Sequence, residues 1–376
     1  MLDGRIPWLD GLRALSILLV ISRHVFDRPF AHFMSYRFSP HPLADYVVAV
    51  FASLGWIGVH IFFVISGFLI GGGAFLAAME GRFSWRAFLA KRLIRVFVPA
   101  VVFLVFYYAY TGRLSQPAQV WLVNMWFITN YTGDHLLPHY WSLCVELHFY
   151  LAVIVVAVFA RRYHDLPTAL GAWLVGSALA FSFAKILAGM LLKQNMYIES
   201  HWQIDFFIAG AGFRFLYEHY RRVLHVRQLP LAVVAIVLYI ATSVFVAAPS
   251  GYFDNQSSQV RLAISLIASL LIAGLLFTAL VFGRAVLNRI FESAPMRMLG
   301  AISYSIYLVH VVLIIEFSFD LPATMAPAMA YFILLIWLTG VSIIGGSVFY
   351  ILIERPLFLA RDMISRSAPT KQQVSP

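Results

Sequence analysis

Long runs of apolar residues, each bounded by short polar or basic segments, recur along the whole chain of 376 residues. A run of about 20 mainly apolar residues is long enough to cross a bilayer as a helix. The pattern therefore predicts an all-α fold, a polytopic membrane bundle of about ten transmembrane helices. The predicted spans cover residues 10–27, 47–72, 93–111, 142–160, 168–191, 202–218, 229–247, 260–283, 302–319 and 328–353.

The composition agrees with a membrane protein and leaves no room for a soluble domain. Hydrophobic residues make up 61% of the chain and charged residues 12%, whereas about 25% of the residues of a soluble domain are charged. The polar stretches between the predicted spans are too short to build a core of their own. We therefore expect one transmembrane domain over residues 1–360 and a polar, disordered cytoplasmic tail over residues 361–376.

The basic residues indicate orientation. The 27 Lys and Arg outnumber the 17 Asp and Glu, which gives a formal net charge of +10. With the N-terminus inside, most of these cations fall on the cytoplasmic side of the predicted spans, which predicts cytoplasmic N- and C-termini. Their spread over separate short loops argues against nucleic-acid binding. The single cysteine, Cys144, excludes an internal disulfide and a cysteine-built metal site, and we expect no metal.

Three polar groups lie in the first predicted span, within Leu12–His24. An ionisable side chain at mid-membrane costs about 3 kcal/mol, so it marks a candidate functional site. Arg13 and Arg23 can also reach the two interfaces along their aliphatic stems, whereas His24 is too short to do so. His24 follows Arg13 by eleven positions, which is about 16 Å of helix and about 20° past three full turns. Arg13 and His24 therefore share one helix face, with the cation nearer the cytoplasm.

The second and third predicted spans supply further candidates. Arg92 and Arg95 are three positions apart, so they lie on one helix face at the membrane entry, with a geometry suited to phosphate. Positive-inside topology is the alternative explanation for this pair. In the segment Gly58–Gly73, small residues favour close helix packing, and we include Ser66 among the candidate binding residues. His60 in this segment either bonds within the bundle or joins the histidine of the first span.

Two later spans contain buried polar groups. Glu146 lies one turn inside the fourth predicted span, at a depth comparable to that of His24. Its carboxylate either orients the imidazole as a catalytic pair or forms a structural ion pair with an outer arginine. His310 lies well inside the ninth predicted span, with Tyr304 on an adjoining face. This pattern is typical of an active site and also of an ordinary hydrogen-bonded core.

These residues together describe a bundle with phosphate-binding cations inside and a histidine toward the outside. Two classes of function fit them: an enzyme that passes a group across the membrane, or a proton-coupled transporter whose His and Glu side chains titrate. No nucleotide loop, zinc motif or haem signature appears in the sequence. Both classes stay open on the residues alone.

The order of the motifs resembles the membrane-bound acyltransferase-3 family of bacterial O-acyltransferases. The family hallmark, an Arg and a His separated by ten residues in the first span, is matched by Arg13 and His24, and the Arg-x-x-Arg motif by Arg92 and Arg95. One departure is His60, where the family often has an acidic residue. The resemblance runs from about residue 8 to residue 356, through the segments LDGLRALSILLVISRH, FFVISGFLI, KRLIRVFVP, WSLCVELHFY, YSIYLVH and ERP.

The resemblance implies an integral protein of the bacterial inner membrane that transfers an acyl group, usually acetyl from acetyl-CoA, to a hydroxyl of a cell-surface or lipid-linked carbohydrate. Donor binding is then expected at Arg13, Arg92, Arg95 and Ser66. Catalysis is expected at His24 as general base, with Glu146 orienting it and His310 or Tyr304 donating to the oxyanion. The acceptor, the acyl chain length and the oligomeric state are not specified by the sequence.

Overall fold

The computed structural model describes residues 6–32, 48, 50, 52, 55–112, 116–162, 170–192, 198–247, 255–283 and 286–360. Regular structure in these residues is helical throughout, with no strand among them. The predicted all-α class is therefore confirmed. The predicted tail, residues 361–376, lies outside the described residues, and so do residues 33–46 of the first predicted loop and residue 47 of the second predicted span.

Several helices of the first half continue one another through wide π-helical turns. The elements between Ile57 and Met79 form one long helix, and those between Trp85 and Tyr110 form another. A π turn adds a residue to the helix and so changes the face on which the following side chains lie. The bounds are α1 Pro7–Val25, η1 Phe26–Phe30, α4 Ile57–Ser66, η2 Gly67–Gly72, α5 Gly73–Met79, α6 Trp85–Arg92, η3 Leu93–Phe97, α7 Val98–Tyr110, α8 Ala118–Met125, α9 Thr129–Thr132, η4 Pro138–Tyr140 and α10 Trp141–Ala160.

The second half contains the longest helices. α16 and α17 are joined with a bend of 70°, and α18 continues through a final π turn. Pro327 begins α18, where its missing N–H costs no intrahelical hydrogen bond. The bounds are α11 Leu170–Leu192, η5 Ser200–Trp202, α12 Ile204–Tyr220, α13 Gln228–Ala247, α14 Asn255–Phe282, α15 Val286–Phe291, α16 Ala294–Ala301, α17 Ser303–Glu316, α18 Pro327–Phe349 and η7 Tyr350–Glu354.

The number of spanning helices differs from the predicted ten. Within the described residues, six helices are long and apolar enough to cross a membrane, or seven if the bent pair α16 and α17 is one span. The predicted first span, α1, carries Asp10, Arg13 and Arg23, and these three charged residues are too many for α1 to be counted among the apolar helices. α12 has only 17 residues, and the apolar part of α11, Leu170–Lys185, is also short. By length and composition, α1, α11 and α12 therefore fall outside the count of spanning helices in the described residues.

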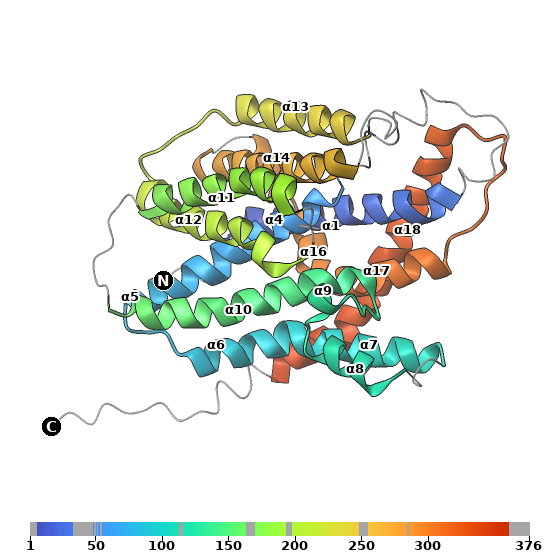
Figure 1. Cartoon of the computed structure of the whole chain (residues 1–376), viewed down its shortest axis with the longest axis horizontal. Coiled ribbons are helices and arrows are strands. Elements are labelled where there is room, and N and C mark those ends of the chain that lie inside the picture. The colour runs from blue at the N-terminus through green and yellow to red at the C-terminus, as the bar shows by residue number, and fades with distance from the viewer. Residues whose placement is uncertain are drawn as a thin grey trace.

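The helix α1 is central to the bundle. It packs against α4, α15, α16, α17 and α18. Figure 1 shows α13 along one edge, beyond α14, and α6 and α7 along the opposite edge, with α1 and α4 between them. Leu12, Ile17 and Ile21 of α1 are fully buried. Side chains on α1 are therefore presented to the interior of the protein.

Glycines allow the backbones of neighbouring helices to touch α1. A Cβ on Gly58 of α4 would overlap the carbonyl oxygen of Ser16, and a Cβ on Gly300 of α16 would overlap that of Asp10. Only glycine permits such contacts between helices. The predicted packing role of the small residues in Gly58–Gly73 is confirmed at Gly58, and the contacts fix α1 at two levels.

Candidate active site

A cavity of about 290 Å³ lies between α1, α4, α6, α10 and α17. It is called the arginine cavity here because Arg13, Arg92 and Arg95 line it. Ser66, Glu146 and Tyr304 line the same cavity. The fold therefore brings together six of the eight side chains proposed from the sequence, although they come from five segments of the chain.

The arginine cavity has the character of an anion-binding site. Three guanidinium groups line it, against the two carboxylates of Glu146 and Glu354. Hydroxyl groups donate to both carboxylates: Ser305 to Glu354 and Ser66 to Glu146. Neither carboxylate forms an ion pair with an arginine in the described chain, although Arg13 pairs with Asp10 at 3.0 Å. The lining of the arginine cavity therefore carries more cationic than anionic groups.

Aromatic rings position two of the three guanidinium groups. Arg92 lies over the rings of Phe88 and Tyr150, with its Cζ 5.6 and 6.0 Å from the ring centroids. Arg95 lies over Phe358 at 5.9 Å. A planar guanidinium stacks on an aromatic face and keeps its N–H groups at the edge. The predicted pairing of Arg92 and Arg95 in one site is supported by this geometry, since η3 carries Arg95 on the same helix.

The expected pair of His24 and Glu146 is not formed. Glu146 accepts a hydrogen bond from Ser66 at 3.0 Å and another from the hydroxyl of Tyr150 at 2.5 Å. It therefore belongs to the arginine cavity, whereas His24 lines a different cavity. Equal depth from the surface placed both groups at one level, but it did not specify which face of α10 turns toward α1.

A second cavity, of about 500 Å³, is lined by His24 and His139 and is called the histidine cavity. Its wall includes Trp56 and Trp141, whose rings give it two aromatic faces. Arg23, Asp27 and Arg261 add charge to the lining, with Arg23 and Asp27 paired at 2.8 Å. Val59 and Tyr307 line both cavities, so these two side chains separate the histidine cavity from the arginine cavity.

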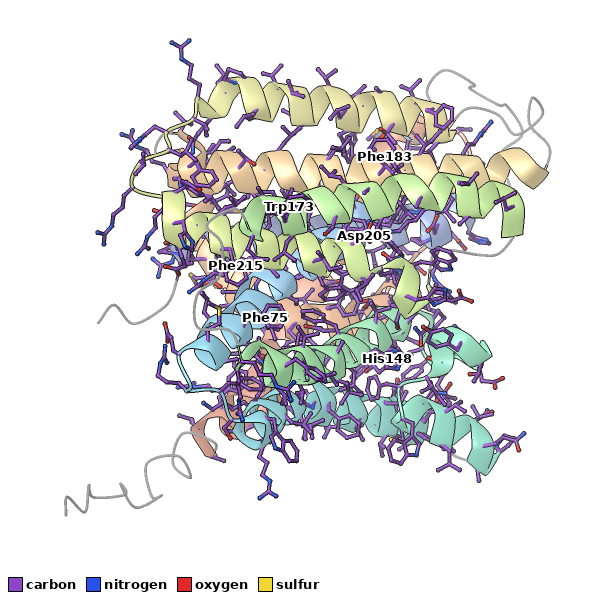
Figure 2. All side chains as sticks on the ribbon, turned by 60° about the vertical axis from the view of Figure 1, so that its left-hand side comes forward. Phe75, His148, Trp173, Phe183, Asp205 and Phe215 are labelled. Atoms are coloured by element: carbon purple, nitrogen blue, oxygen red, sulfur yellow. The ribbon has the colours of Figure 1, made fainter. Side chains whose placement is uncertain are left out.

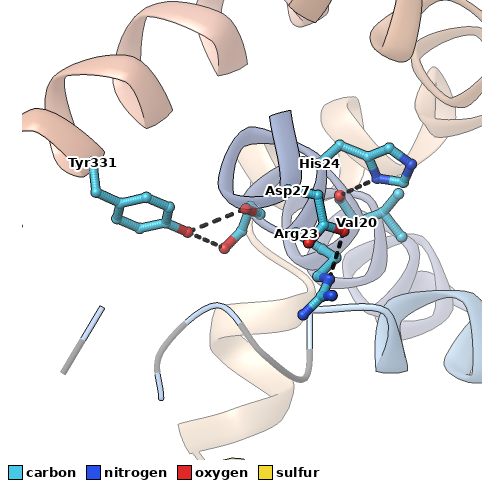
Figure 3. A network of polar contacts seen from close by, with 6 residues as sticks. Val20, Arg23, His24, Asp27 and Tyr331 are labelled. Carbon is cyan, nitrogen blue, oxygen red and sulfur yellow. Dashed lines mark hydrogen bonds and ion pairs between the residues drawn. The ribbon is translucent and has the colours of Figure 1, made fainter. Parts of the chain in front are cut away.

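The tautomer of His24 follows from one contact on α1. Its Nδ1 atom lies 3.0 Å from the carbonyl oxygen of Val20, as Figure 3 shows beside the Arg23–Asp27 pair. A carbonyl can only accept, so in the neutral ring Nδ1 carries the proton and Nε2 keeps its lone pair. Val20, rather than Glu146, thus orients the imidazole. Nε2 of His24 is suited to act as a base.

Two more histidines stand beside His24. The ring of His310 meets that of His24 edge-to-face, with centroids 5.0 Å apart, and His139 lies 5.2 Å from His310. His310 is fully buried, with Nδ1 2.7 Å from the carbonyl oxygen of Tyr307. It lines neither cavity, so its role in the structure is to pack against the ring of His24. No group of three or more such side chains in the described residues is arranged to hold a metal.

Tyr304 occupies a different position from the one expected of an oxyanion donor. Its hydroxyl donates to the carbonyl oxygen of Val96 at 2.5 Å, and it lines the arginine cavity alone. The tyrosine one turn further on, Tyr307, faces both cavities. The spacing along α17 could not distinguish the two tyrosines, because they lie one turn apart on the helix and both line the arginine cavity.

His60 does not join His24. It is fully buried, stacks on Phe206 with ring centroids 4.2 Å apart, and lines neither cavity. Near it, Lys185 donates to both carboxylate oxygens of Asp205, at 2.8 and 2.7 Å, and neither side chain is exposed. Figure 2 labels Asp205 inside the bundle. This half of the protein holds a sealed ion pair away from both cavities.

Sequence reasoning missed four residues of the two cavities. His139 was counted with the loop before the fourth span, yet it is buried, with Nε2 3.1 Å from the carbonyl oxygen of Leu308. Tyr150 lies one turn beyond Glu146, and that spacing was a usable signal. Tyr307 and Glu354 also line the arginine cavity and were not among the residues proposed from the sequence.

A family model described as an acyltransferase domain, acyltransferase-3, matches residues 6–350. The chain belongs to the acyltransferase-3 family. The matched residues include the candidate site residues from Arg13 to His310, whereas Glu354 of the arginine cavity lies beyond the match. Members of this family are membrane proteins, and with its six or seven long apolar helices the chain is a multi-pass membrane protein.

Two relatives of this acyltransferase-3 protein are described as O-acetyltransferases. The peptidoglycan O-acetyltransferase OatA of Listeria monocytogenes is 25% identical over 327 residues, which cover 81% of this chain and 49% of that protein. The O-acetyltransferase OatA of Staphylococcus aureus is 28% identical over 174 residues, covering 41% of this chain and 25% of that protein. This chain spans half or less of the length of these relatives. No solved structure matches it.

Proposed function

We propose that this protein transfers an acyl group, in the first instance acetyl, from acyl-CoA to a hydroxyl group of a carbohydrate. Membership of the acyltransferase-3 family supports acyl transfer, and the two relatives named as O-acetyltransferases support an acetyl group on oxygen. The proposed location is the bacterial cytoplasmic membrane, with Arg13 toward the cytoplasm and His24 toward the outside.

One observation carries the proposal. Arg13 and His24 belong to the same helix, α1, yet Arg13 lines the arginine cavity and His24 the histidine cavity. The two cavities share Val59 and Tyr307 as a common wall. The proposed anion-binding site and the proposed base therefore lie in neighbouring cavities, with the side chains of Val59 and Tyr307 between them. Such an arrangement suits a donor bound on one side and an acceptor on the other.

The arginine cavity suits the phosphates of coenzyme A. Arg13, Arg92 and Arg95 offer fork-shaped donors that match phosphate oxygens. The pantetheine arm is slender and weakly polar, so it can extend along the apolar residues of α4, such as Phe63 and Ile65, toward the shared wall. In this arrangement the thioester reaches the side of Val59 and Tyr307 while the phosphates stay with the arginines.

His24 acts as the general base in the proposed transfer. Its Nε2 takes the proton of the acceptor hydroxyl as that oxygen attacks the thioester carbonyl. The new carbon–oxygen bond forms, the carbon–sulfur bond breaks, and the coenzyme A thiolate receives the proton back from His24. The sum is acyl-CoA and hydroxyl converted to ester and free coenzyme A, with Val20 holding the other ring nitrogen throughout.

The histidine cavity suits a carbohydrate acceptor. Aromatic rings such as Trp56 and Trp141 offer apolar faces, and the charged side chains of Arg23, Asp27 and Arg261 can bond hydroxyl groups. Its volume of about 500 Å³ is sufficient for part of a larger chain. We therefore propose a cell-surface or lipid-linked carbohydrate as the acceptor.

The alternative, a proton-coupled transporter, has weaker support. It requires titratable groups that share one pathway. His24 and Glu146 line different cavities, and the buried Lys185–Asp205 pair lines none of the cavities described above. Neither observation favours solute movement.

The test uses membranes that contain the protein and membranes that lack it. With acetyl-labelled acetyl-CoA and no proton gradient, we expect base-labile label on glycan in the first set alone. Gradient-driven solute uptake without ester formation would contradict the acyltransferase proposal and favour the transporter. Comparison of O-acetyl groups on surface glycans with and without the gene, by mass spectrometry, then identifies the acceptor.

A further inference from the structure

The wall between the two cavities contains one polar side chain with access to both. Val59 and Tyr307 are the residues that line the arginine cavity and the histidine cavity alike. Val59 offers only methyl groups, whereas Tyr307 has a hydroxyl. An acyl group that passes from one cavity to the other must go by these two side chains.

The hydrogen bonds of Tyr307 define where its proton lies. Its hydroxyl is 2.6 Å from the carbonyl oxygen of His139 and 2.5 Å from Oγ of Ser142. A carbonyl accepts only, so the single phenolic proton is donated to His139, and the hydroxyl of Ser142 donates to the phenol oxygen. Tyr307 is thus a hydrogen-bond donor that is already directed and almost fully buried, at 6% exposure.

Ser142 makes a change of partner possible. Its Oγ also lies 3.4 Å from the same carbonyl oxygen of His139. If Tyr307 turns its proton to a new acceptor, Ser142 can donate to the carbonyl in its place, so the buried carbonyl oxygen of His139 keeps a donor. The wall can therefore release the donor of Tyr307 at small cost. Among the described residues, the hydroxyl of Tyr304 bonds the carbonyl oxygen of Val96, and no second side chain shares that hydrogen bond.

We propose that Tyr307 is the catalytic hydrogen-bond donor of the transfer: its hydroxyl leaves the His139 carbonyl and binds the thioester oxygen at the wall, while Val59 sets the width available to the acyl group. This inference rests on the proposed function. Tyr307 keeps its proton and stabilises the negative charge that develops on the carbonyl oxygen when the acceptor attacks. The ring of Tyr307 lies 5.4 Å from that of His310, which in turn contacts His24, so donor and base are neighbours.

The first test is Tyr307→Phe, which keeps the ring and removes the hydroxyl. We expect kcat for ester formation from acetyl-CoA to fall by ~10²-fold while KM for acetyl-CoA changes by less than ~3-fold, because the donor acts on the transition state. Tyr140→Phe is the matched control: its hydroxyl is also buried and donates to a backbone carbonyl, that of Ala100 at 3.1 Å, but it lines neither cavity. It should keep kcat within ~3-fold.

Equal effects of Tyr307→Phe and Tyr140→Phe on kcat would overturn the role of Tyr307. Absence of ester formation by the unaltered protein would overturn the proposed function and this inference together. Coenzyme A binding, measured by titration calorimetry, checks that each variant is folded. If Tyr307→Phe does not fold, Val59→Ala tests the proposed wall instead. The rate of ester formation with propionyl-CoA relative to acetyl-CoA should rise by several-fold in this variant. An unchanged ratio would contradict a wall at Val59 and Tyr307.

Discussion

The Nδ1 atom of His24 lies 3.0 Å from the carbonyl oxygen of Val20, one helical turn earlier on α1. This backbone contact fixes the tautomer without a carboxylate, because every residue of a helix offers a carbonyl to the side chain four positions later. A histidine placed on a central helix can therefore be oriented by its own helix, and its other nitrogen remains for chemistry.

Replacement of His24 by alanine should lower kcat of ester formation by ~10²- to 10⁴-fold, the usual contribution of a general base. Acetyl-CoA affinity should stay nearly unchanged, since the arginine cavity is intact. His219→Ala is the control, because Nδ1 of His219 bonds the carbonyl of Phe215 in the same way, at 2.9 Å, outside both cavities. Activity retained by His24→Ala would remove His24 from the mechanism.

Replacement of Arg92 or Arg95 by alanine should raise KM for acetyl-CoA by about tenfold or more, because each charged hydrogen bond is worth about 1.5 to 3 kcal/mol. The effect should depend on salt. Acetyl-pantetheine, which lacks the nucleotide phosphates, should show no difference between these variants and the unaltered protein. Arg86→Ala, an exposed cation on the same helix, is the control. Unchanged donor KM in both variants would leave the pair with a role in topology.

The buried pair of Lys185 and Asp205 should behave as a unit in stability measurements. Asp205→Leu leaves an unpaired ammonium group in the interior, which costs about 3 to 5 kcal/mol. The double variant Lys185→Met with Asp205→Leu removes both charges and should recover most of the thermal midpoint in detergent. If the double variant unfolds at as low a temperature as the single one, the pair is not the source of the loss.

The glycines of the helix Ile57–Met79 should differ in their tolerance of an added methyl group. Gly58→Ala forces α4 away from Ser16 of α1, so yield and thermal midpoint should fall. Gly73→Ala meets no atom within 4 Å and should be neutral or stabilising, since alanine is the better helix former. Equal stability of the two variants would contradict the close contact between α1 and α4.

The sequence predicted the residue types of the site better than their partners. Arg13, Arg92 and Arg95 were recognisable from their spacing on predicted helices, which places Arg13 on one face with His24 and Arg92 on one face with Arg95, and the three arginines line one cavity. The partner of Glu146 was not predictable, because depth in the membrane is readable from sequence whereas the rotation of one helix against another depends on packing.

The same limit explains the residues that were missed. His139 belongs to the 3₁₀ turn η4, where no helical period indicates which side chains are buried. Tyr307 is hydrophobic enough to resemble a core residue, and its position in the lining of both cavities, which distinguishes it from Tyr304, depends on the packing of the helices. The count of spans in the described residues is lower than predicted because α1 carries three charged side chains and α12 is only 17 residues long.

The glycine contacts at Asp10 and Ser16 hold α1 in place in the bundle, so the distance between the groups at its two ends is constant. Arg13 and His24 are about 16 Å apart along this helix, so in the proposed transfer the distance from the phosphates of the donor to its thioester has to match that spacing. A thioester on a shorter arm would stop below Val59, and one on a longer arm would have to fold back. Selection among thioesters by this protein would then depend on arm length before it depended on the acyl group.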